Sequence, residues 1–267
     1  MILSNFHTHT SYCDGKNTCE EMIQAALKSG FSRLGFSGHG YTPFDLSFCM
    51  SAENQQKYIS EINDLKEKYK GKIDILCGIE QDILSEEDTS MFDYVILSSH
   101  YISGKGKRYD VDNTPEIVSN AINEIFDGDP MKYAEVYYSD VAKTPKCDIV
   151  GHFDLLTKFD EKHHFFDTSS KKYKELALDA LREVAKRNTL FEINTGAISR
   201  SWRTSPYPEP FLLKEMKRLG CEIIVNSDCH DAENLSCHFR ESEELLKSTG
   251  FRYRTELSSS GLVHIKL

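Results

Sequence analysis

The sequence contains no apolar run approaching the roughly 18 residues that a membrane-spanning helix requires. Its beginning also lacks the basic segment and the following apolar segment of a cleaved signal peptide, so we expect a cytoplasmic protein with no membrane partner. Its eight cysteines include no Cys-x-x-Cys pair, which favours reduced, partly buried thiols over a disulfide framework.

Basic residues are outnumbered as well: 32 Lys and Arg stand against 42 Asp and Glu, which gives a formal net charge of −10 at pH 7. This balance argues against a broad nucleic-acid-binding surface. A small anionic substrate is compatible with it, because bound divalent cations can reverse the local field. We therefore expect a small-molecule partner and no nucleic acid, while the sequence leaves the oligomeric state open.

Residues 1–267 contain no linker, low-complexity segment or internal repeat, so a single domain is predicted. Apolar strand segments alternate with segments of helical period. The predicted strands are 2–6, 33–37, 73–78, 94–98, 147–151, 190–194 and 222–226. The predicted helices are 18–29, 52–70, 115–126, 130–142, 169–187, 208–219 and 233–248. Segments 251–255 and 262–266 have the pattern of a terminal hairpin.

Local signals mark two of the helix starts. Thr18 and Glu21 have the spacing of a capping box, and Thr114-Pro115 has the pattern of an N-cap followed by the first helical residue. The succession of β-then-α units implies a parallel sheet with right-handed crossovers. Strands this apolar, buried on both faces, fit either a barrel or a doubly wound sheet.

Six of the ten histidines lie where predicted strands end. The segments concerned are His7-Thr8-His9, Gly38-His39, Gly78-Ile79-Glu80, Ser99-His100, Gly151-His152 and Asp228-Cys229-His230. Metal ligands and catalytic groups gather at the C-terminal ends of parallel strands, which carry the loops of one face. A barrel lets these ends converge on one axis, whereas an open sheet spreads them along a crevice. The pattern therefore favours a barrel with a multinuclear metal site.

Two of these segments have the same spacing at opposite ends of the strand order. His7 and His9 leave the same face of an extended segment, so both can bind one cation. Asp228 and His230 repeat that spacing on the last strand, which neighbours the first in a closed barrel. Glu80 is the best candidate for a bridging ligand, since one carboxylate can give an oxygen to each of two metals.

The remaining strand-end residues extend the predicted site. His100 and His152 supply further imidazoles, and Asp14 and His39 could serve a third cation. Taken singly, Asp14-Gly15 is typical of a turn and His39 between two glycines is typical of a loop. Only the joint pattern favours metal ligation.

In this order, the segments resemble the polymerase-and-histidinol-phosphatase (PHP) superfamily. The resemblance rests on His7-x-His9, Asp14-Gly15, Gly38-His39, Gly78-Ile79-Glu80, Ser99-His100, Gly151-His152 and Asp228-x-His230. It spans nearly the whole chain and is closest to the stand-alone histidinol-phosphate phosphatases. It implies an α/β fold, a distorted (β/α)7 barrel with its metal site at the C-terminal strand ends.

The resemblance also implies two or three divalent metal ions. Their ligand sets are His7, His9, Glu80 and Asp228 for the first, Glu80, His100 and His152 for the second, and Asp14, His39 and His230 for the third. Some relatives have histidine where this chain has Asp14, and a carboxylate favours a harder ion. Zinc, manganese and iron therefore all stay open.

The activity implied by the resemblance is that of a phosphomonoesterase, which hydrolyses L-histidinol phosphate to L-histidinol and phosphate in histidine biosynthesis. The expected catalytic residues are Glu80, Asp228 and His230, with Asp228 or a water molecule as the proton donor. One alternative is a PHP-family phosphoesterase that acts on nucleotides or nucleic-acid ends. The others are a non-catalytic metal-binding module and an amidohydrolase-like enzyme, although the lysine carbamate usual in the latter has no counterpart here.

Binding of the substrate needs further side chains. Arg200 and Arg203 follow the strand 190–194, and arginine presents a planar fork suited to phosphate. Trp202 and Glu192 are candidates to contact the amine and imidazole of histidinol. The basic cluster Lys105, Lys107 and Arg108 fits a solvated charge run better than a pocket cover. Surface or packing positions are expected for His163, His164, His238 and His264.

Overall fold

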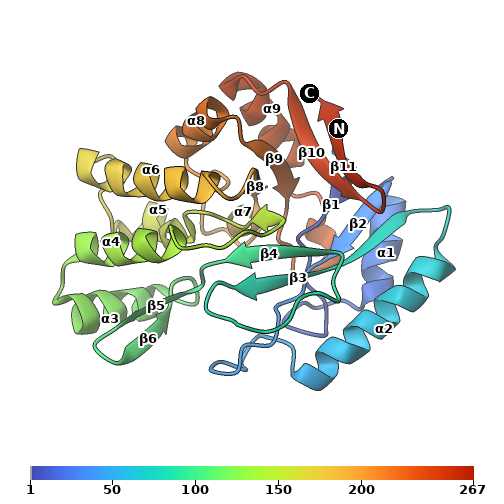
Figure 1. Cartoon of the computed structure of the whole chain (residues 1–267), viewed down its shortest axis with the longest axis horizontal. Coiled ribbons are helices and arrows are strands. Elements are labelled where there is room, and N and C mark those ends of the chain that lie inside the picture. The colour runs from blue at the N-terminus through green and yellow to red at the C-terminus, as the bar shows by residue number, and fades with distance from the viewer. Residues whose placement is uncertain (1) are drawn as a thin grey trace.

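Seven parallel strands form one sheet that curls into a nearly closed barrel in the computed structural model, which describes residues 2–267 (Figure 1). In sheet order they are β1 (Ser4–Asn5), β2 (Arg33–Phe36), β3 (Asp74–Asp82), β4 (Tyr94–Ser98), β7 (Ile149–Val150), β8 (Leu190–Asn194) and β9 (Glu222–Asn226). Every neighbouring pair runs parallel. A bridge between Thr8 and Cys229, with the His9 amide donating to the Cys229 carbonyl at 2.9 Å, joins the first strand to the last. The predicted (β/α)7 barrel is confirmed.

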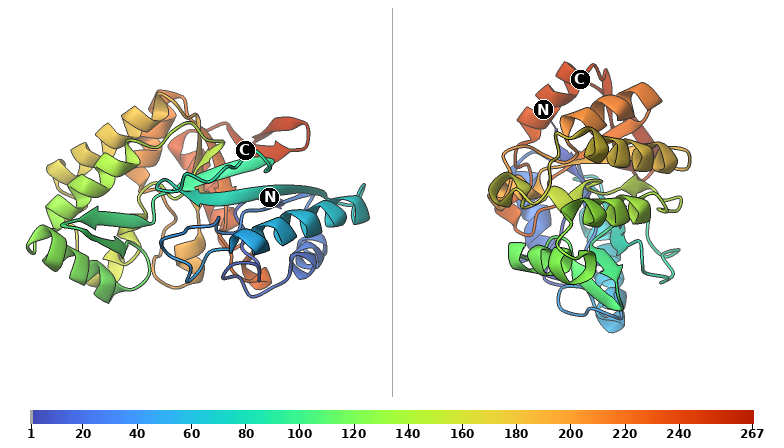
Figure 2. Two further views of the ribbon diagram at one scale, coloured as in Figure 1. Left: turned by 60° about the horizontal axis from the view of Figure 1, so that its bottom comes forward. Right: turned by 90° about the vertical axis from the view of Figure 1, so that its left-hand side faces the viewer.

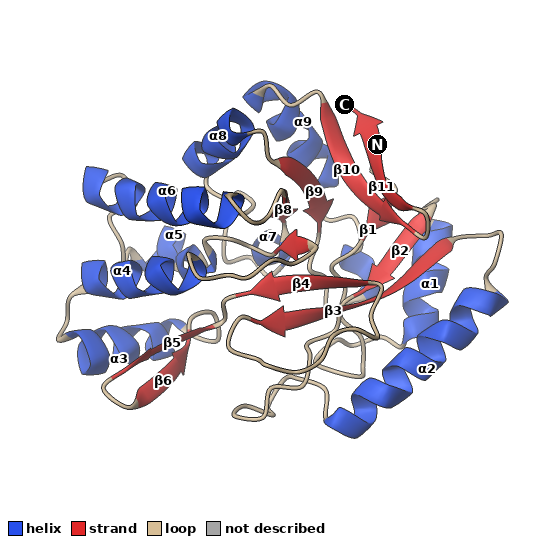
Figure 3. Cartoon of the chain, in the orientation of Figure 1, coloured by secondary structure: helices blue, strands red, loops and turns tan. Residues whose placement is uncertain are grey.

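Helices surround the strands on the outside (Figure 3). They are α1 (Cys19–Lys28), α2 (Ala52–Lys68), α3 (Pro115–Phe126), α4 (Pro130–Val141), α5 (Asp160–His163), α6 (Lys171–Ala185), α7 (Gly196–Ser199), α8 (Pro210–Leu219) and α9 (Phe239–Thr249). Helices α3, α4 and α6 form one layer that keeps together in every view (Figure 2). Within residues 2–267, no helix combines the length and the apolar character needed to cross a bilayer.

The helix-start signals in the sequence are confirmed. The Thr18 side chain accepts from the Glu21 amide at 3.2 Å, and the Glu21 carboxylate accepts from the Thr18 amide at 2.9 Å. At the start of α3 the Thr114 side chain accepts from the Ile117 amide at 3.3 Å, with Pro115 in the first turn. The eight cysteines are all free thiols, as expected.

Several segments differ from the sequence prediction, and the short helices α5 and α7 were not predicted. The helix predicted at 233–248 is a short 3-10 turn (Ala232–Asn234) followed by α9, because His238, with φ of 53°, interrupts the backbone before Phe239. Strands β5 (Tyr101–Gly104) and β6 (Lys107–Asp110) form an antiparallel hairpin that was not predicted. Its turn residues Lys105 and Gly106 both have positive φ, the conformation that a tight two-residue turn requires.

The C-terminal hairpin was predicted and is present as β10 (Tyr253–Ser258) and β11 (Gly261–Lys266). Strand β10 packs against β9, and Leu257 joins the apolar side chains that fill the barrel interior. The hairpin therefore helps to close the core of the barrel.

Tyr94 fills the barrel interior beneath the predicted site. A Cβ atom at Gly35 would lie 2.4 Å from the Tyr94 hydroxyl oxygen, and one at Gly78 would lie 2.3 Å from its ring. Only glycine leaves room for this ring. The hydroxyl donates to the carbonyls of Phe6 at 2.6 Å and Phe36 at 3.0 Å, so it ties down the ends of β1 and β2. His7 follows directly from this anchored position.

Candidate metal centre

All nine residues predicted as metal ligands lie in one cluster at the C-terminal ends of the strands. Their ligand atoms form four overlapping groups within 4.8 Å: His9 with Asp14, His39 and His230; His7 with Glu80 and His152; His7 with His9 and Asp228; and His39 with Glu80 and His100. We call His7, His9, Glu80, His100, His152 and Asp228 the inner group, and Asp14, His39 and His230 the outer group. The remaining histidines, His163, His164, His238 and His264, belong to none of these groups.

Glu80 lies at the centre of the inner group. Its Oε1 is 3.0 Å from Nε2 of His152 and 3.3 Å from Nε2 of His100. Its Oε2 is 3.1 Å from Nε2 of His7 and 3.1 Å from Nδ1 of His39. The two oxygens therefore face different sets of imidazoles, which is the geometry that a bridging carboxylate needs.

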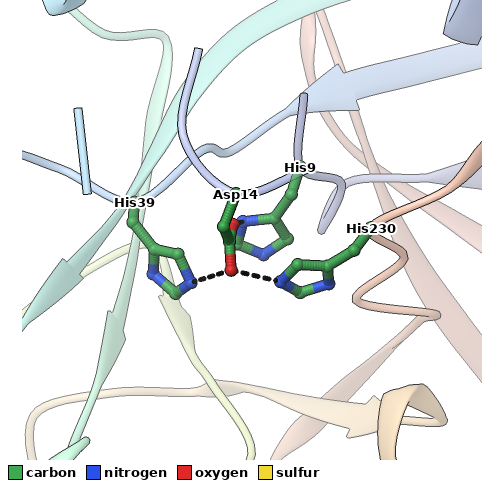
Figure 4. Close-up of side chains that lie close together, drawn as sticks. All are labelled: His9, Asp14, His39 and His230. Atoms are coloured by element: carbon green, nitrogen blue, oxygen red, sulfur yellow. Dashed lines mark ion pairs between the residues drawn. The ribbon is translucent and has the colours of Figure 1, made fainter. Parts of the chain in front are cut away.

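Asp14 lies between the histidines of the outer group (Figure 4). Its Oδ2 is 3.1 Å from Nε2 of His230 and 3.9 Å from Nε2 of His39. The loop that carries Asp14 folds back on β1 because Gly15 has no side chain: a Cβ there would lie 2.5 Å from the backbone of His9. The Asp14-Gly15 segment is thus a turn that also directs a carboxylate into the cluster.

Two further carboxylates lie behind the histidines. Glu192 is buried, and its Oε1 is 2.7 Å from Nδ1 of His7. Asp82 accepts from the backbone amide of His100 at 2.8 Å, and its Oδ2 is 3.3 Å from Nδ1 of that ring. This placement corrects the suggestion that Glu192 contacts the substrate, because its carboxylate is enclosed beneath His7.

The donor set fits divalent cations. Nε2 of His7 and Nε2 of His9 are buried and make no hydrogen bond within the described residues. Each nevertheless lies 3.1 Å from a carboxylate oxygen, that of Glu80 or of Asp228. Imidazole lone pairs that converge with carboxylates suit zinc, manganese or iron.

The charge states in the cluster also suit cation binding. Burial raises the pKa of Glu80, but His7 and His100 outweigh it and bring the pKa well below its usual value. Burial likewise opposes ionisation of Asp228, yet Arg200 and the histidines lower its pKa well below normal. For His9, burial and the neighbouring histidines lower the pKa to about 3, so its ring is neutral. Ionised carboxylates and neutral imidazoles are the forms that bind metals.

His7 shows the opposite shift. Burial lowers its pKa, but Glu192, Glu80 and Asp228 together raise it well above its usual value. The carboxylates around this ring therefore favour positive charge there, and a divalent cation at Nε2 would satisfy them as a proton does.

A cavity of about 470 Å³ opens onto the cluster. Its walls are formed by Asp14, His39, Ser47, Phe48, Glu80, His100, Asp110, Asp112, Asn113, His152, Lys158, Arg200, Asp228 and His230. Two of these side chains, Lys158 and Arg200, are basic. The cavity thus combines the ligand cluster, two positive side chains and an acidic wall formed by Asp110 and Asp112.

Arg200 reaches the cavity from the end of the short helix α7. Its Nη2 donates to Oδ2 of Asp228 at 3.1 Å, and its Nη1 donates to the Asp228 carbonyl at 3.0 Å. Gly196 permits this pair, since a Cβ there would lie 2.8 Å from both Arg200 and Asp228. Arg200, which was predicted to bind the substrate phosphate, therefore lies in the cavity wall beside the ligand Asp228.

Arg203 and Trp202 lie elsewhere, which counts against their predicted contact with the substrate. Arg203 donates to Glu209 at 2.6 Å, to the Thr157 carbonyl at 3.1 Å and to the Ser205 carbonyl at 3.2 Å, so its guanidinium is already engaged in packing the loop. The Trp202 ring packs edge-on against Phe159 at 4.7 Å. Neither side chain lines the cavity described above.

The acidic wall and Lys158, the lysine that pairs with it, were not predicted from the sequence. Lys158 donates to the Asp112 carboxylate at 2.9 Å, and Asp110 lies nearby on the end of β6. No motif marks these positions, although Asp110 and Asp112 come soon after the basic residues Lys107 and Arg108. The hairpin lysines point elsewhere: Lys105 pairs with Asp127 at 2.7 Å, and Lys107 pairs with Glu124. The solvated charge run expected for them agrees with these contacts.

Comparison with known proteins places the chain in a family. Residues 5–196 match the PHP domain. A probable histidinol-phosphatase from Deinococcus radiodurans is 29% identical and aligns with 94% of this chain and 95% of its own length. A histidinol-phosphatase from Bacillus subtilis is 27% identical, over 85% of this chain and 92% of its own. The crystal structure of a Lactococcus lactis histidinol phosphate phosphatase, complexed with zinc, L-histidinol and phosphate, has the same fold, with a TM-score of 0.74 at 23% identity over 97% of this chain and 98% of its own.

Proposed function

The chain belongs to the PHP domain family, and we propose that it is a metal-dependent phosphomonoesterase that hydrolyses L-histidinol phosphate to L-histidinol and phosphate. The observation that carries this proposal is the convergence of eight histidine and aspartate side chains around Glu80, beside a cavity that holds two cationic side chains. The relatives named histidinol-phosphatase support the choice of substrate. So does the Lactococcus lactis complex with L-histidinol and phosphate.

We propose that the ligand cluster holds two or three divalent cations. His7, His9, Glu80 and Asp228 would hold the first, Glu80, His100 and His152 the second, and Asp14, His39 and His230 the third. When bound, such ions offset charge on phosphoryl oxygens and lower the pKa of a water molecule that attacks phosphorus. The zinc of the Lactococcus lactis structure supports one candidate ion, while the Asp14 carboxylate also suits manganese or iron.

Arg200 and Lys158 would bind the phosphate group. Both line the cavity. Asp228 holds the guanidinium in place, so little reorganisation is needed when charge develops on the equatorial phosphoryl oxygens. Lys158, whose ammonium donates to Asp112 at 2.9 Å, adds a point charge to the same cavity.

The acidic wall would receive the leaving group. Histidinol carries an amine and an imidazole, and Asp110 and Asp112 offer carboxylates in the same cavity as the metal ligands. Burial opposes ionisation of Asp112, but Lys158 and His100 bring its pKa to about 2, so the carboxylate is charged at neutral pH. Phe48, which lies 4.8 Å from the His39 ring, provides an aromatic surface beside this wall.

Proton transfer to the leaving alkoxide would come from water. Asp228 was one candidate donor, but its lowered pKa keeps it ionised, which favours a ligand role. Glu80 and His230 would act with Asp228 as the catalytic ligands that orient the reacting groups. We further propose that residues 1–267 work as one domain in the cytoplasm.

The test is phosphate release from L-histidinol phosphate beside a panel of nucleotides and sugar phosphates, with manganese, zinc or iron supplied separately. We expect strong preference for histidinol phosphate and loss of activity with a chelator. Preferential turnover of a nucleotide would contradict the substrate, and absence of turnover across the whole panel would contradict catalysis.

A further inference from the structure

We propose that Glu192 is a positioning residue that fixes the tautomer and orientation of His7 and thereby sets the metal affinity of the inner group. The inference rests on the metal centre of the proposed function, and it does not depend on which phosphate ester is the substrate. Glu192 is 1% exposed, does not line the cavity and therefore acts only through its neighbours.

Both carboxylate oxygens of Glu192 are engaged, each by two donors. Oε1 accepts from Nδ1 of His7 at 2.7 Å and from the Asn226 amide at 2.9 Å. Oε2 accepts from the backbone amide of His152 at 3.0 Å and from the Asn194 side chain at 3.0 Å. One side chain on β8 thus links residues that follow β1 and β7 to a residue of β9.

This pattern selects a carboxylate over an amide. A glutamine at this position would have to turn its NH2 group toward two of these four donors. A buried donor that faces other donors makes no hydrogen bond, which lowers the stability of the folded protein. If that NH2 group faced His7, the ring would accept at Nδ1 and carry its proton on Nε2. The lone pair that faces Glu80 at 3.1 Å and Asp228 at 3.7 Å would then be lost.

The negative charge of Glu192 has an effect beyond the orientation of the His7 ring. A carboxylate that accepts from the second ring nitrogen makes the imidazole a stronger ligand, and removal of such partners commonly weakens metal affinity about 10- to 100-fold. The backbone contact with His152 extends the effect to a second inner ligand, because it holds the segment that presents His152 to Glu80 at 3.0 Å.

The experiment compares Glu192→Gln with the wild-type protein by calorimetric titration of the metal-free forms with zinc and with manganese. We expect affinity for the tightest ion to fall about 10- to 100-fold, and excess metal to restore part of kcat. Glu256→Gln is the matched control, because Glu256 is also a buried carboxylate but lies on the C-terminal hairpin, where it contacts Arg254 of β10 and Arg33 of β2. It should lower the unfolding temperature without changing metal affinity.

A second measurement does not depend on whether the variant folds. Heteronuclear NMR of the imidazole nitrogens in the zinc-loaded wild-type protein should find the His7 proton on Nδ1. A proton on Nε2, an unchanged affinity in Glu192→Gln, or an equal loss in Glu256→Gln would overturn the proposal. Failure of the proposed function is a separate result, seen as a wild-type protein that binds metal but releases no phosphate.

Discussion

The inner and outer groups of the cluster differ in how closely the protein surrounds them. Side chains of the inner group are at most 9% exposed, whereas those of His39, His230 and Asp14 are 12%, 23% and 33% exposed. The inner ligands are also supported from behind: Glu192 contacts His7, Asp82 contacts His100, and Ser98 donates to Glu80 at 2.7 Å.

The outer group has less support. Asp14 lies on a loop, and its Oδ2 is 3.9 Å from His39. Supported ligands hold their geometry before a metal arrives, whereas a loop ligand is ordered on binding and loses conformational entropy then. We therefore expect the inner group to bind its metal ions tightly and the outer group to exchange its ion readily with ions in solution.

The largest effect is expected from removal of the central inner ligand. Glu80→Ala, and separately His9→Ala, should lower kcat/KM at least about a thousandfold, because the ions that stabilise the transition state lose their shared support. Phosphate release measures the loss, and far-ultraviolet circular dichroism checks the fold. His264→Ala is the control, since this exposed histidine pairs with Glu222 outside the cluster. Substantial activity in both inner variants would refute the metal assignment.

Arg200 lies where the two groups meet, with its guanidinium 3.1 Å from both the Asp228 carboxylate and Nδ1 of His230. Arg200→Lys should lower kcat/KM about a hundredfold, because a point charge cannot contact Asp228 and phosphate with a planar fork. Steady-state kinetics with separate kcat and KM would show the change. A variant with wild-type kinetics would exclude Arg200 from phosphate binding.

Asp14→Asn tests the outer group directly. We expect a loss of about tenfold that excess metal partly restores, because only the exchangeable ion is weakened. Metal content after dialysis should fall in this variant while the ions of the inner group are retained. The comparison between the groups fails if the inner ions leave first, or if the loss equals that of Glu80→Ala.

The smallest effect is expected from Asp110→Asn, which leaves both groups intact. Loss of this carboxylate should weaken turnover of L-histidinol phosphate about threefold and leave that of p-nitrophenyl phosphate, which has no cationic group, nearly unchanged. Asp127→Asn serves as the control, because Asp127 pairs with Lys105 in the turn of the hairpin formed by β5 and β6. An equal loss with both esters would remove Asp110 from substrate selection.

Much of this architecture could be predicted because it depends on local patterns. Hydrophobic periodicity located the strands, and six of the seven strand ends carry a ligand within a few residues, as in Ile79-Glu80 and Gly151-His152. Convergence of these ends then follows from closure of the barrel, seen in the bridge between Thr8 and Cys229.

The parts that escaped prediction depend on long-range contacts or on single dihedral angles. Lys158 and Asp112 form their ion pair across a sequence separation of 46 residues, and no spacing rule connects them. Arg200 and Arg203 were both predicted to bind the substrate, yet Ser201, with φ of 59°, turns the chain between them. As a result, Arg200 faces the cavity and Arg203 is engaged by Glu209.

The most direct test of the metal centre is a crystal structure of the protein grown with manganese, with the ions located by anomalous scattering. We expect two inner ions about 3.5–4 Å apart, each contacting a different oxygen of Glu80, and a weaker peak near Asp14. Anomalous peaks that avoid Glu80, or a single ion held by the outer group alone, would contradict this expectation.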